Sequence, residues 1–141
     1  MTRPPIKPQE GRGPKTAMVA LGVLMALGLA TGICLADATG TASYYTVASC
    51  LQEGTSGITA SGEALDDAKL TCAAWGYKFG TRLTVTNLEN GRSVVVTVND
   101  RGPSKRLVAK GRIIDLSRGA FATIADLKQG IIRVNVSTTG N

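Results

Sequence analysis

Apolar and polar residues alternate along several short stretches of the chain, and this period of two is typical of half-buried β-strands. The clearest case joins Thr81–Asn87 (TRLTVTN) to the β-branched run Arg92–Val98 (RSVVVTV). Between them, Asn90-Gly91 is the commonest signal of a tight hairpin turn. The pattern therefore predicts a β-hairpin in this part of the chain.

Three further segments have the composition of strands. They are Gly40–Val47 (GTASYYTV), Gly111–Leu116 (GRIIDL) and Gly130–Val136 (GIIRVNV). Ser117 is a candidate N-cap for a short helix that runs to about Asp126. Residues 48–70 are polar and rich in glycine, which predicts a long loop with little regular structure. Loops of that length in a compact domain are usually functional.

The N-terminal region has the pattern of an export signal. The uncharged run Ala17–Ala36 follows a basic segment and precedes Ala36-Asp37-Ala38, whose small residues suit signal peptidase. We therefore divide the chain into a leader, residues 1–38, and one domain, residues 39–141. The apolar run is also nearly long enough to span a bilayer, so an uncleaved membrane anchor remains an alternative.

The cysteines give information about the cellular compartment in which the protein is found. Cys34 lies late in the apolar run, but Ile33 stands where lipid-modified cysteines need a small residue, which argues against a lipoprotein. We expect an exported protein of the periplasm or cell wall, secreted or membrane-anchored. In that oxidising compartment Cys50 and Cys72 are expected to form a disulfide, with two independent buried thiols as the alternative.

Composition and charge narrow the classes of function. The length allows one hydrophobic core, and abundant Gly, Val, Thr and Ala with few aromatic residues favour an all-β domain. The net charge of +6 is a mild basic excess, which does not choose among wall polymers, acidic glycans and nucleic acid. The chain has no histidine and too few cysteines for structural zinc, so we expect no metal site.

Acidic residues beside turn-forming residues occur in three segments. These are Thr59–Glu63 (TASGE), Val98–Pro103 (VNDRGP) and Ile113–Ser117 (IIDLS). Asp100 follows a strongly apolar strand, a rigid place from which a side chain can be aimed at a surface groove. Asp115 stands among apolar residues and is expected to need a partner, for which Arg101 or Arg112 is available.

The motif NGRSVVVTVNDRGP, followed by GRIIDLS and preceded by TASGE, resembles the domain of the rare lipoprotein A family over nearly all of residues 39–141. The resemblance implies a mainly β fold: a six-stranded double-psi β-barrel with one or two short helices, preceded here by the signal or anchor helix. It also implies a lytic transglycosylase, a carbon–oxygen lyase without cofactors. Such an enzyme cleaves peptidoglycan glycan strands without water to 1,6-anhydro ends, and prefers naked strands that lack stem peptides.

By motif position, the resemblance makes Glu63 and Asp100 the candidate catalytic acids. Cleavage of a glycosidic bond needs a proton for the leaving oxygen and stabilisation of an oxocarbenium-like centre, and carboxyl groups serve both needs. We expect Asp100 to act as acid and then base, with Glu63 orienting substrate across the groove. A solvated loop acid at Glu63 and a turn-capping Asp100 are the alternatives. Asp115 is expected to be a structural acid.

We expect Trp75 and Tyr77 to bind substrate together with Asn99 and Arg101, because aromatic faces stack on sugar rings. Core packing is the alternative for Trp75. Members of the family commonly carry a histidine after a Thr-Ala-Ala segment, whereas this chain has LTCAAW over residues 70–75. Any proton relay would therefore run on carboxyl groups alone.

The expected partner is the peptidoglycan glycan strand and not nucleic acid. The protein is expected to be a monomer, with inner-membrane anchoring through its N-terminal segment as the alternative to a cleaved leader. Two other functions remain open. One is a non-catalytic, expansin-like peptidoglycan-binding module, and the other is a small exported protein that binds a partner at the division site.

Overall fold

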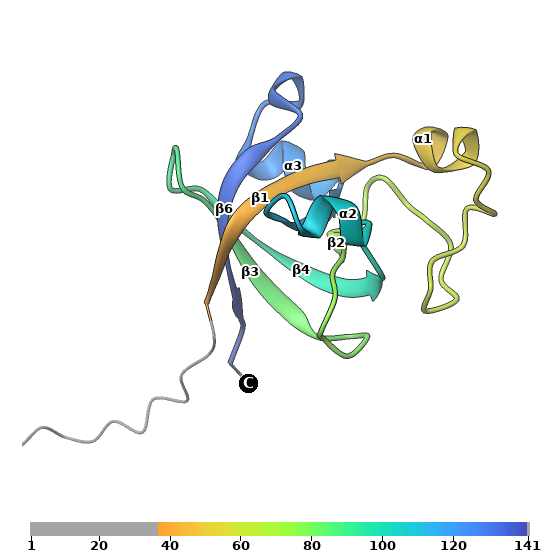
Figure 1. Ribbon diagram of the computed structural model, residues 1–141, viewed down its shortest axis with the longest axis horizontal. Coiled ribbons are helices and arrows are strands. Elements are labelled where there is room, and N and C mark those ends of the chain that lie inside the picture. The colour runs from red at the N-terminus through yellow and green to blue at the C-terminus, as the bar shows by residue number, and fades with distance from the viewer. Residues whose placement is uncertain (1–36, 141) are drawn as a thin grey trace, which may run out of the picture. The chain divides into compact units, whose positions relative to one another are not determined.

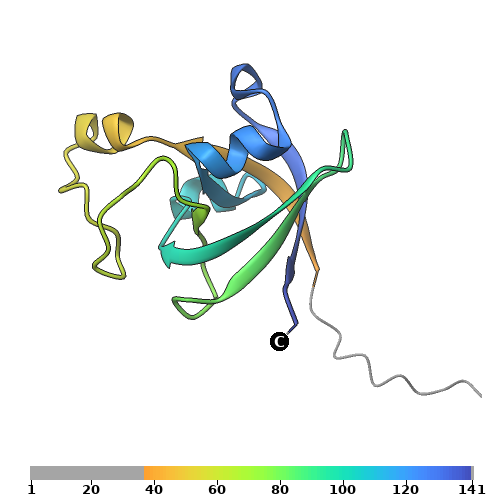
Figure 2. The same ribbon diagram turned by 180° about the vertical axis from the view of Figure 1, so that it is seen from behind.

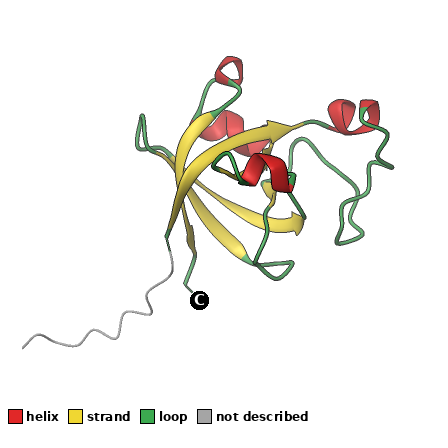
Figure 3. Ribbon diagram, viewed as in Figure 1, coloured by secondary structure: helices red, strands yellow, loops and turns green. Residues whose placement is uncertain are grey.

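The structure is a computed structural model that describes residues 37–140. Its six strands are β1 (Ala38–Tyr45), β2 (Thr71–Ala73), β3 (Arg82–Asn87), β4 (Ser93–Asp100), β5 (Arg112–Ser117) and β6 (Ile132–Thr138). The helices are α1 (Val47–Gln52), α2 (Lys105–Val108), α3 (Arg118–Ile124) and the 3-10 turn η1 (Leu127–Gln129), all visible in Figures 1 and 3. The expected leader, including Cys34, lies outside the described residues apart from its last two positions.

The strands close into a barrel in the order β1-β5-β2-β4-β3-β6. The pairs β1–β5 and β2–β4 are parallel, and the other neighbouring pairs are antiparallel. Figure 2 shows the barrel from behind, with α3 packed against it. This arrangement confirms the expected six-stranded double-psi β-barrel.

The predicted hairpin is confirmed as β3 and β4. The two strands pair antiparallel, with Leu83 opposite Val96 and Val85 opposite Val94. The turn closes where the Asn87 amide donates to the Arg92 carbonyl at 2.8 Å. Gly91 has a φ of 74°, a left-handed conformation that glycine adopts at little cost. The Asn-Gly signal therefore located this turn correctly.

The barrel interior is filled by apolar side chains from all six strands and closed by α3. Its fully buried larger side chains include Leu83, Val85, Val96, Val98, Ile114, Leu116, Ile132 and Val134. Phe121 and Ile124 of α3 join this core, and the Phe121 ring lies 4.9 Å from that of Tyr44. Burial of one such side chain contributes about 1.5–3 kcal/mol. The period-two pattern of the strands is what supplies these inward-facing positions.

The connection from β1 to β2 is more ordered than the sequence pattern predicts. Helix α1 begins directly after Thr46, whose hydroxyl accepts from the Ser49 amide while the Ser49 hydroxyl accepts from the Thr46 amide. Asp67 accepts from the Val47 amide at 2.8 Å, and its carbonyl accepts from the Gly119 amide at 2.8 Å. The connection is thereby fastened to both α1 and α3.

The predicted disulfide is not formed in the structure, where Cys50 and Cys72 are both free thiols. Cys72 has no exposed surface and packs in the barrel core, while Cys50 lies half-buried on α1, which extends to the side of the barrel in Figure 1. Burial raises the pKa of Cys72 to about 12. The structure thus has two separate thiols, one in the barrel core and one on α1, in place of the bond expected from the sequence.

Within residues 37–140, no helix combines the length and the apolar character that crossing a membrane requires.

Candidate active site

Two of the three acidic segments, those of Asp100 and Asp115, lie next to Ala73, one on each side of it. In the sheet, Ala73 of β2 pairs with Asp100 of β4 on one side and with Asp115 of β5 on the other. The β2–β4 register shifts between Cys72 and Ala73, so β4 carries an irregularity just before Asp100. This shift breaks the inward alternation of β4 and places Asp100 beside Ala73, away from the apolar core.

The Asp100 carboxylate holds the loop that carries Glu63. Its Oδ1 atom accepts hydrogen bonds from the backbone amides of Ala60 at 3.0 Å and Arg101 at 2.8 Å. The Ser61 amide donates to the carbonyl of Asn99 at 3.1 Å. The TASGE segment therefore lies directly on the end of β4, where Figure 1 shows the long connection passing the tip of that strand.

Glu63 closes a tight turn on that loop. Its carbonyl accepts from the Thr59 amide at 2.8 Å, and the Thr59 carbonyl accepts from the Gly62 amide at 2.9 Å. The exposed Glu63 carboxylate accepts from Nδ2 of Asn99 at 3.3 Å. The structure thus brings Glu63 and Asp100, the two predicted catalytic acids, to the same end of β4.

Asn99 is buried, with 4% of its surface exposed, so its side chain positions Glu63 instead of facing a substrate. Arg101 donates from Nη1 to the carbonyl of Ala74 at 3.0 Å, and its guanidinium lies 4.0 Å from the centre of the Phe79 ring. Arg101 therefore fastens the β2–β3 connection to the end of β4. Asn99 and Arg101, two of the four residues expected to bind substrate, therefore have contacts that organise the site itself.

Asp115 has a different partner from the one expected. Its Oδ1 atom accepts a hydrogen bond from the Ser43 hydroxyl at 2.7 Å. Burial raises the pKa of Asp115, and the Ser43 bond and the positive charge of Arg112 offset this only in part. The expectation of an arginine hydrogen bond is therefore wrong, because β1 pairs with β5 and presents Ser43 opposite Asp115.

Gly102 leaves room next to this carboxyl group. A Cβ atom at Gly102 would lie 3.2 Å from the Cβ of Ala73 and 3.7 Å from Oδ2 of Asp115. The first of these distances is tighter than ordinary packing. Small residues at both positions therefore keep the space between the two aspartates free of bulky side chains.

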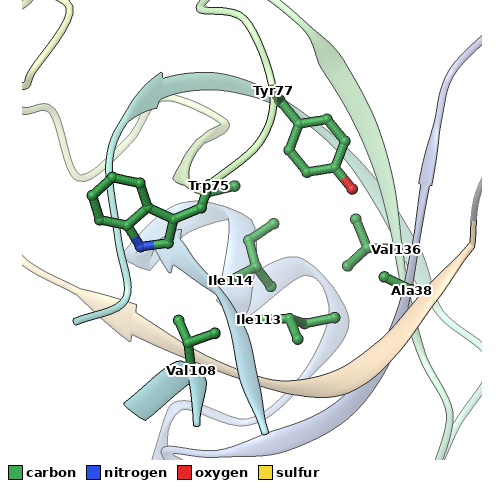
Figure 4. Close-up of a pocket in the computed structure, with 8 residues that line it drawn as sticks. Ala38, Trp75, Tyr77, Val108, Ile113, Ile114 and Val136 are labelled. Carbon is green, nitrogen blue, oxygen red and sulfur yellow. The ribbon is translucent and has the colours of Figure 1, made fainter. Parts of the chain in front are cut away.

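Trp75 and Tyr77 line a cavity of about 210 Å³ (Figure 4). The other lining residues are Ala38, Ala74, Val108, Ile113, Ile114 and Val136. Figure 4 shows the Tyr77 ring near Val136 and Ala38, and Trp75 on the side of Val108. Trp75 keeps 44% of its surface exposed and donates from Nε1 to the Pro103 carbonyl at 2.6 Å. Tyr77 packs against the core, so the two aromatic residues differ in accessibility.

Several residues that contribute to the site could not be identified from the sequence pattern. The Tyr45 hydroxyl lies 3.3 Å from Oγ1 of Thr71, and burial raises its pKa to about 12, with the Asp100 charge adding to the rise. Phe79 supports Arg101, and Ser43 supports Asp115. Nothing in their local sequence marks them, because their roles depend on strand register and loop packing. Among the described residues there is no group of three or more His, Cys, Asp or Glu side chains suited to a metal ion.

Comparison with known proteins identifies the family. Residues 37–136 match the family described as lytic transglycolase. The chain belongs to this family. That match covers β1 to most of β6 and includes every acid described above.

Named relatives agree with this assignment. The probable endolytic peptidoglycan transglycosylase RlpA of Nostoc sp. is 45% identical over 82 residues, which make up 58% of this chain and 21% of that protein. The endolytic peptidoglycan transglycosylase RlpA of Campylobacter jejuni is 42% identical over 82 residues, 58% of this chain and 28% of that protein. The Escherichia coli K12 RlpA is 46% identical over 65 residues, 46% of this chain and 17% of that protein. The chain thus spans less than a third of the length of these relatives.

Solved structures share the barrel. The Streptomyces papain inhibitor superposes with a TM-score of 0.56 at 27% identity, covering 74% of this chain and 94% of that one. A mutant Clavibacter michiganensis expansin in complex with cellohexaose gives a TM-score of 0.54 at 22% identity, covering 74% of this chain and 50% of that one. The likeness to the expansin shows a common fold.

Proposed function

We propose that this domain is an endolytic lytic transglycosylase that cleaves the glycan strands of peptidoglycan. The observation that carries the proposal is the meeting of Glu63 and Asp100 at the end of β4, within a family whose matching relatives are named for this activity. Two carboxyl groups are the usual means of breaking a glycosidic bond. The preferred substrate in this proposal is a naked strand that lacks stem peptides.

In the proposed reaction, Asp100 protonates the glycosidic oxygen that leaves. The 6-hydroxyl of the same sugar then attacks the anomeric carbon, and Asp100 takes up the proton of that hydroxyl, so the product is a 1,6-anhydro end. Glu63, held by Asn99, orients the sugar or stabilises the positive charge that develops at the anomeric carbon. Proton transfer by a positioned side chain contributes about 10²–10⁴-fold to such a rate.

Asp115 is a second carboxyl group within the same face of the sheet. It lies on the other side of Ala73 from Asp100, and burial raises its pKa, so it keeps its proton to a higher pH than an ordinary aspartic acid. A carboxyl group in that state is suited to donate a proton or a hydrogen bond to a sugar hydroxyl. We therefore give Asp115 a supporting role, that of donating a proton or hydrogen bond to a sugar hydroxyl, and keep Asp100 as the acid that transfers the proton to the leaving oxygen.

The test is the digestion of peptide-stripped sacculi with the purified protein. Release of sugars with 1,6-anhydro ends supports the proposal, and release of reducing ends from hydrolysis contradicts it. Retention on sacculi without any product would instead support a non-catalytic, expansin-like module, which the shared barrel fold accommodates. The proposal requires an exported protein of the periplasm or cell wall, because that is where this substrate is available.

A further inference from the structure

The connection between β4 and β5 is strongly basic. Residues 101–111 contain four cationic side chains and no acidic one: Arg101, Lys105, Arg106 and Lys110. Lys105, Arg106 and Lys110 are exposed on or next to α2. Arg101 is committed to the Ala74 carbonyl and the Phe79 ring, so the accessible positive charge lies along α2. A surface of this kind favours an anionic ligand.

Lys105 is the cation that meets the cavity. Lys105 and Val108 are one turn apart in α2 and therefore lie on one side of it, and Val108 lines the cavity. The Lys105 ammonium lies 5.9 Å from the centre of the Trp75 ring, which lines the same cavity. The Pro103 carbonyl fixes the Trp75 indole. A positive charge thus lies beside two residues that line an apolar cavity, Trp75 and Val108, and Figure 4 shows both of them.

The size and lining of the cavity restrict its occupant. Its walls are aliphatic and aromatic, and its volume of about 210 Å³ is below the roughly 300–1,000 Å³ of pockets for drug-sized ligands. It accommodates one apolar substituent of a sugar and not an oligosaccharide. The ligand that fits therefore combines a small apolar group with a nearby negative charge.

The cavity adjoins the proposed catalytic acids. Ala74, which precedes Trp75, donates its amide to the Asp100 carbonyl at 3.2 Å. On the other wall, Ile113 is two residues from Asp115 along β5, so the two side chains lie on the same face of that strand. Two lining residues of the cavity, Ala74 and Ile113, are thus joined to the acids, one through a backbone hydrogen bond to Asp100 and the other along β5 to Asp115.

We propose that Lys105, with the cavity bounded by Trp75 and Val108, is a subsite for a muramic acid residue whose stem peptide has been removed. The lactyl group of that sugar carries a methyl group for the cavity and a carboxylate for the Lys105 ammonium. When a stem peptide is attached, the same carboxyl is an amide and has no charge to offer. The proposal rests on the proposed function and specifies which surface recognises the naked strand.

The experiment compares binding of the full-length protein, carrying Asp100→Asn so that strands stay intact, to two ligands. One is peptide-stripped glycan with free lactyl carboxylates, and the other is the same glycan with these carboxyls converted to methylamides. We expect the free form to bind about three- to tenfold more tightly. Lys105→Gln is expected to bring the two affinities to within a factor of two, and Lys105→Arg to restore the difference.

Arg133→Gln is the matched control, because Arg133 is an exposed cation on β6, outside the basic connection. It is expected to keep the difference between the two ligands. Val108→Glu, which places a negative charge at the cavity, is expected to weaken binding of the free form more than that of the methylamide form. Circular dichroism verifies that each variant is folded.

Three results would overturn the subsite: equal binding of both ligands by the parent protein, an undiminished preference in Lys105→Gln, or stronger Lys105-dependent binding to a polyglycerol phosphate than to stripped glycan. The last would mean that the surface binds a phosphate polymer of the wall. Failure of the proposed function would be a different result. The protein with Asp100 intact would then release no anhydro product, even where the Asp100→Asn protein still prefers the free carboxylate form.

Discussion

Asn99 donates a hydrogen bond from its buried side-chain amide to the carboxylate of Glu63, at 3.3 Å. This bond joins the last residues of β4 to a loop acid 36 positions earlier in the chain. The orientation of Glu63 therefore depends on a side chain that is itself almost wholly buried.

Asn99→Ala is expected to lower kcat for glycan cleavage by about tenfold or more, because Glu63 loses its fixed orientation. Loss of this partly buried hydrogen bond is also expected to cost about 1–3 kcal/mol of stability. Steady-state kinetics and urea unfolding measure the two effects. An unchanged kcat in a folded variant would mean that Glu63 needs no positioning by Asn99.

The Asp100 carboxylate has a structural as well as a proposed chemical role. Asp100→Asn keeps an oxygen that accepts from the amides of Ala60 and Arg101, so its free energy of unfolding is expected to stay within about 1 kcal/mol of the parent. Asp100→Ala removes both bonds and is expected to cost about 1.5–3 kcal/mol. Urea unfolding of the two variants side by side tests this, and an equal loss in both would contradict it.

Asp115 is expected to give stability a specific dependence on pH. Its pKa in the folded protein is raised by burial, so the folded state holds this proton more tightly than the unfolded chain does. The parent protein therefore loses stability relative to Asp115→Asn as the pH rises from near 3.8 through the raised folded pKa, and the difference is constant above it. Unfolding free energies of both proteins across this range provide the measurement. A parent protein that instead gains stability relative to Asp115→Asn over this range would show that the positive charge of Arg112 lowers the pKa of Asp115 more than burial raises it.

The thiols are expected to react separately. Under native conditions without reductant, iodoacetamide modifies Cys50 on α1, whereas Cys72 stays unmodified until the protein is unfolded, because it is buried and its pKa is raised to about 12. Peptide mapping by mass spectrometry separates these sites from Cys34. Protection of both Cys50 and Cys72 until a reductant is added would instead mean that they are joined in a disulfide.

Much of the barrel is predictable from the sequence because its strands bury one face each. The alternation in residues 81–98, with Asn90-Gly91 between the strands, determines a hairpin that the structure contains. The Ser117 cap is likewise observed, since its hydroxyl accepts from the Ala120 amide. Strand β2 has only three residues, too few for a period to show, and α1 begins with a Thr-Ser pair instead of the usual Thr-Glu capping box.

The candidate site is harder to predict from the sequence than the strands are, because it forms only when the barrel closes. The motifs containing Glu63 and Asp100 could be found, but their connection through Asn99 depends on the irregularity in β4. The parallel pairing of β1 with β5 supplies Ser43 to Asp115, and a local pattern cannot express such a pairing. Lys105 stands over Trp75 for the same reason, since 30 positions separate them along the chain and packing alone brings them together.

The most direct measurement is mass spectrometry of the products that the purified protein releases from peptide-stripped sacculi, with the parent compared to Glu63→Gln and Asp100→Asn. We expect 1,6-anhydro ends from the parent, a loss of about 10²–10⁴-fold in Asp100→Asn, and a smaller loss in Glu63→Gln. Undiminished release of anhydro products by a folded Asp100→Asn variant, or no such product from the parent, would contradict the assignment of these two acids as the catalytic pair.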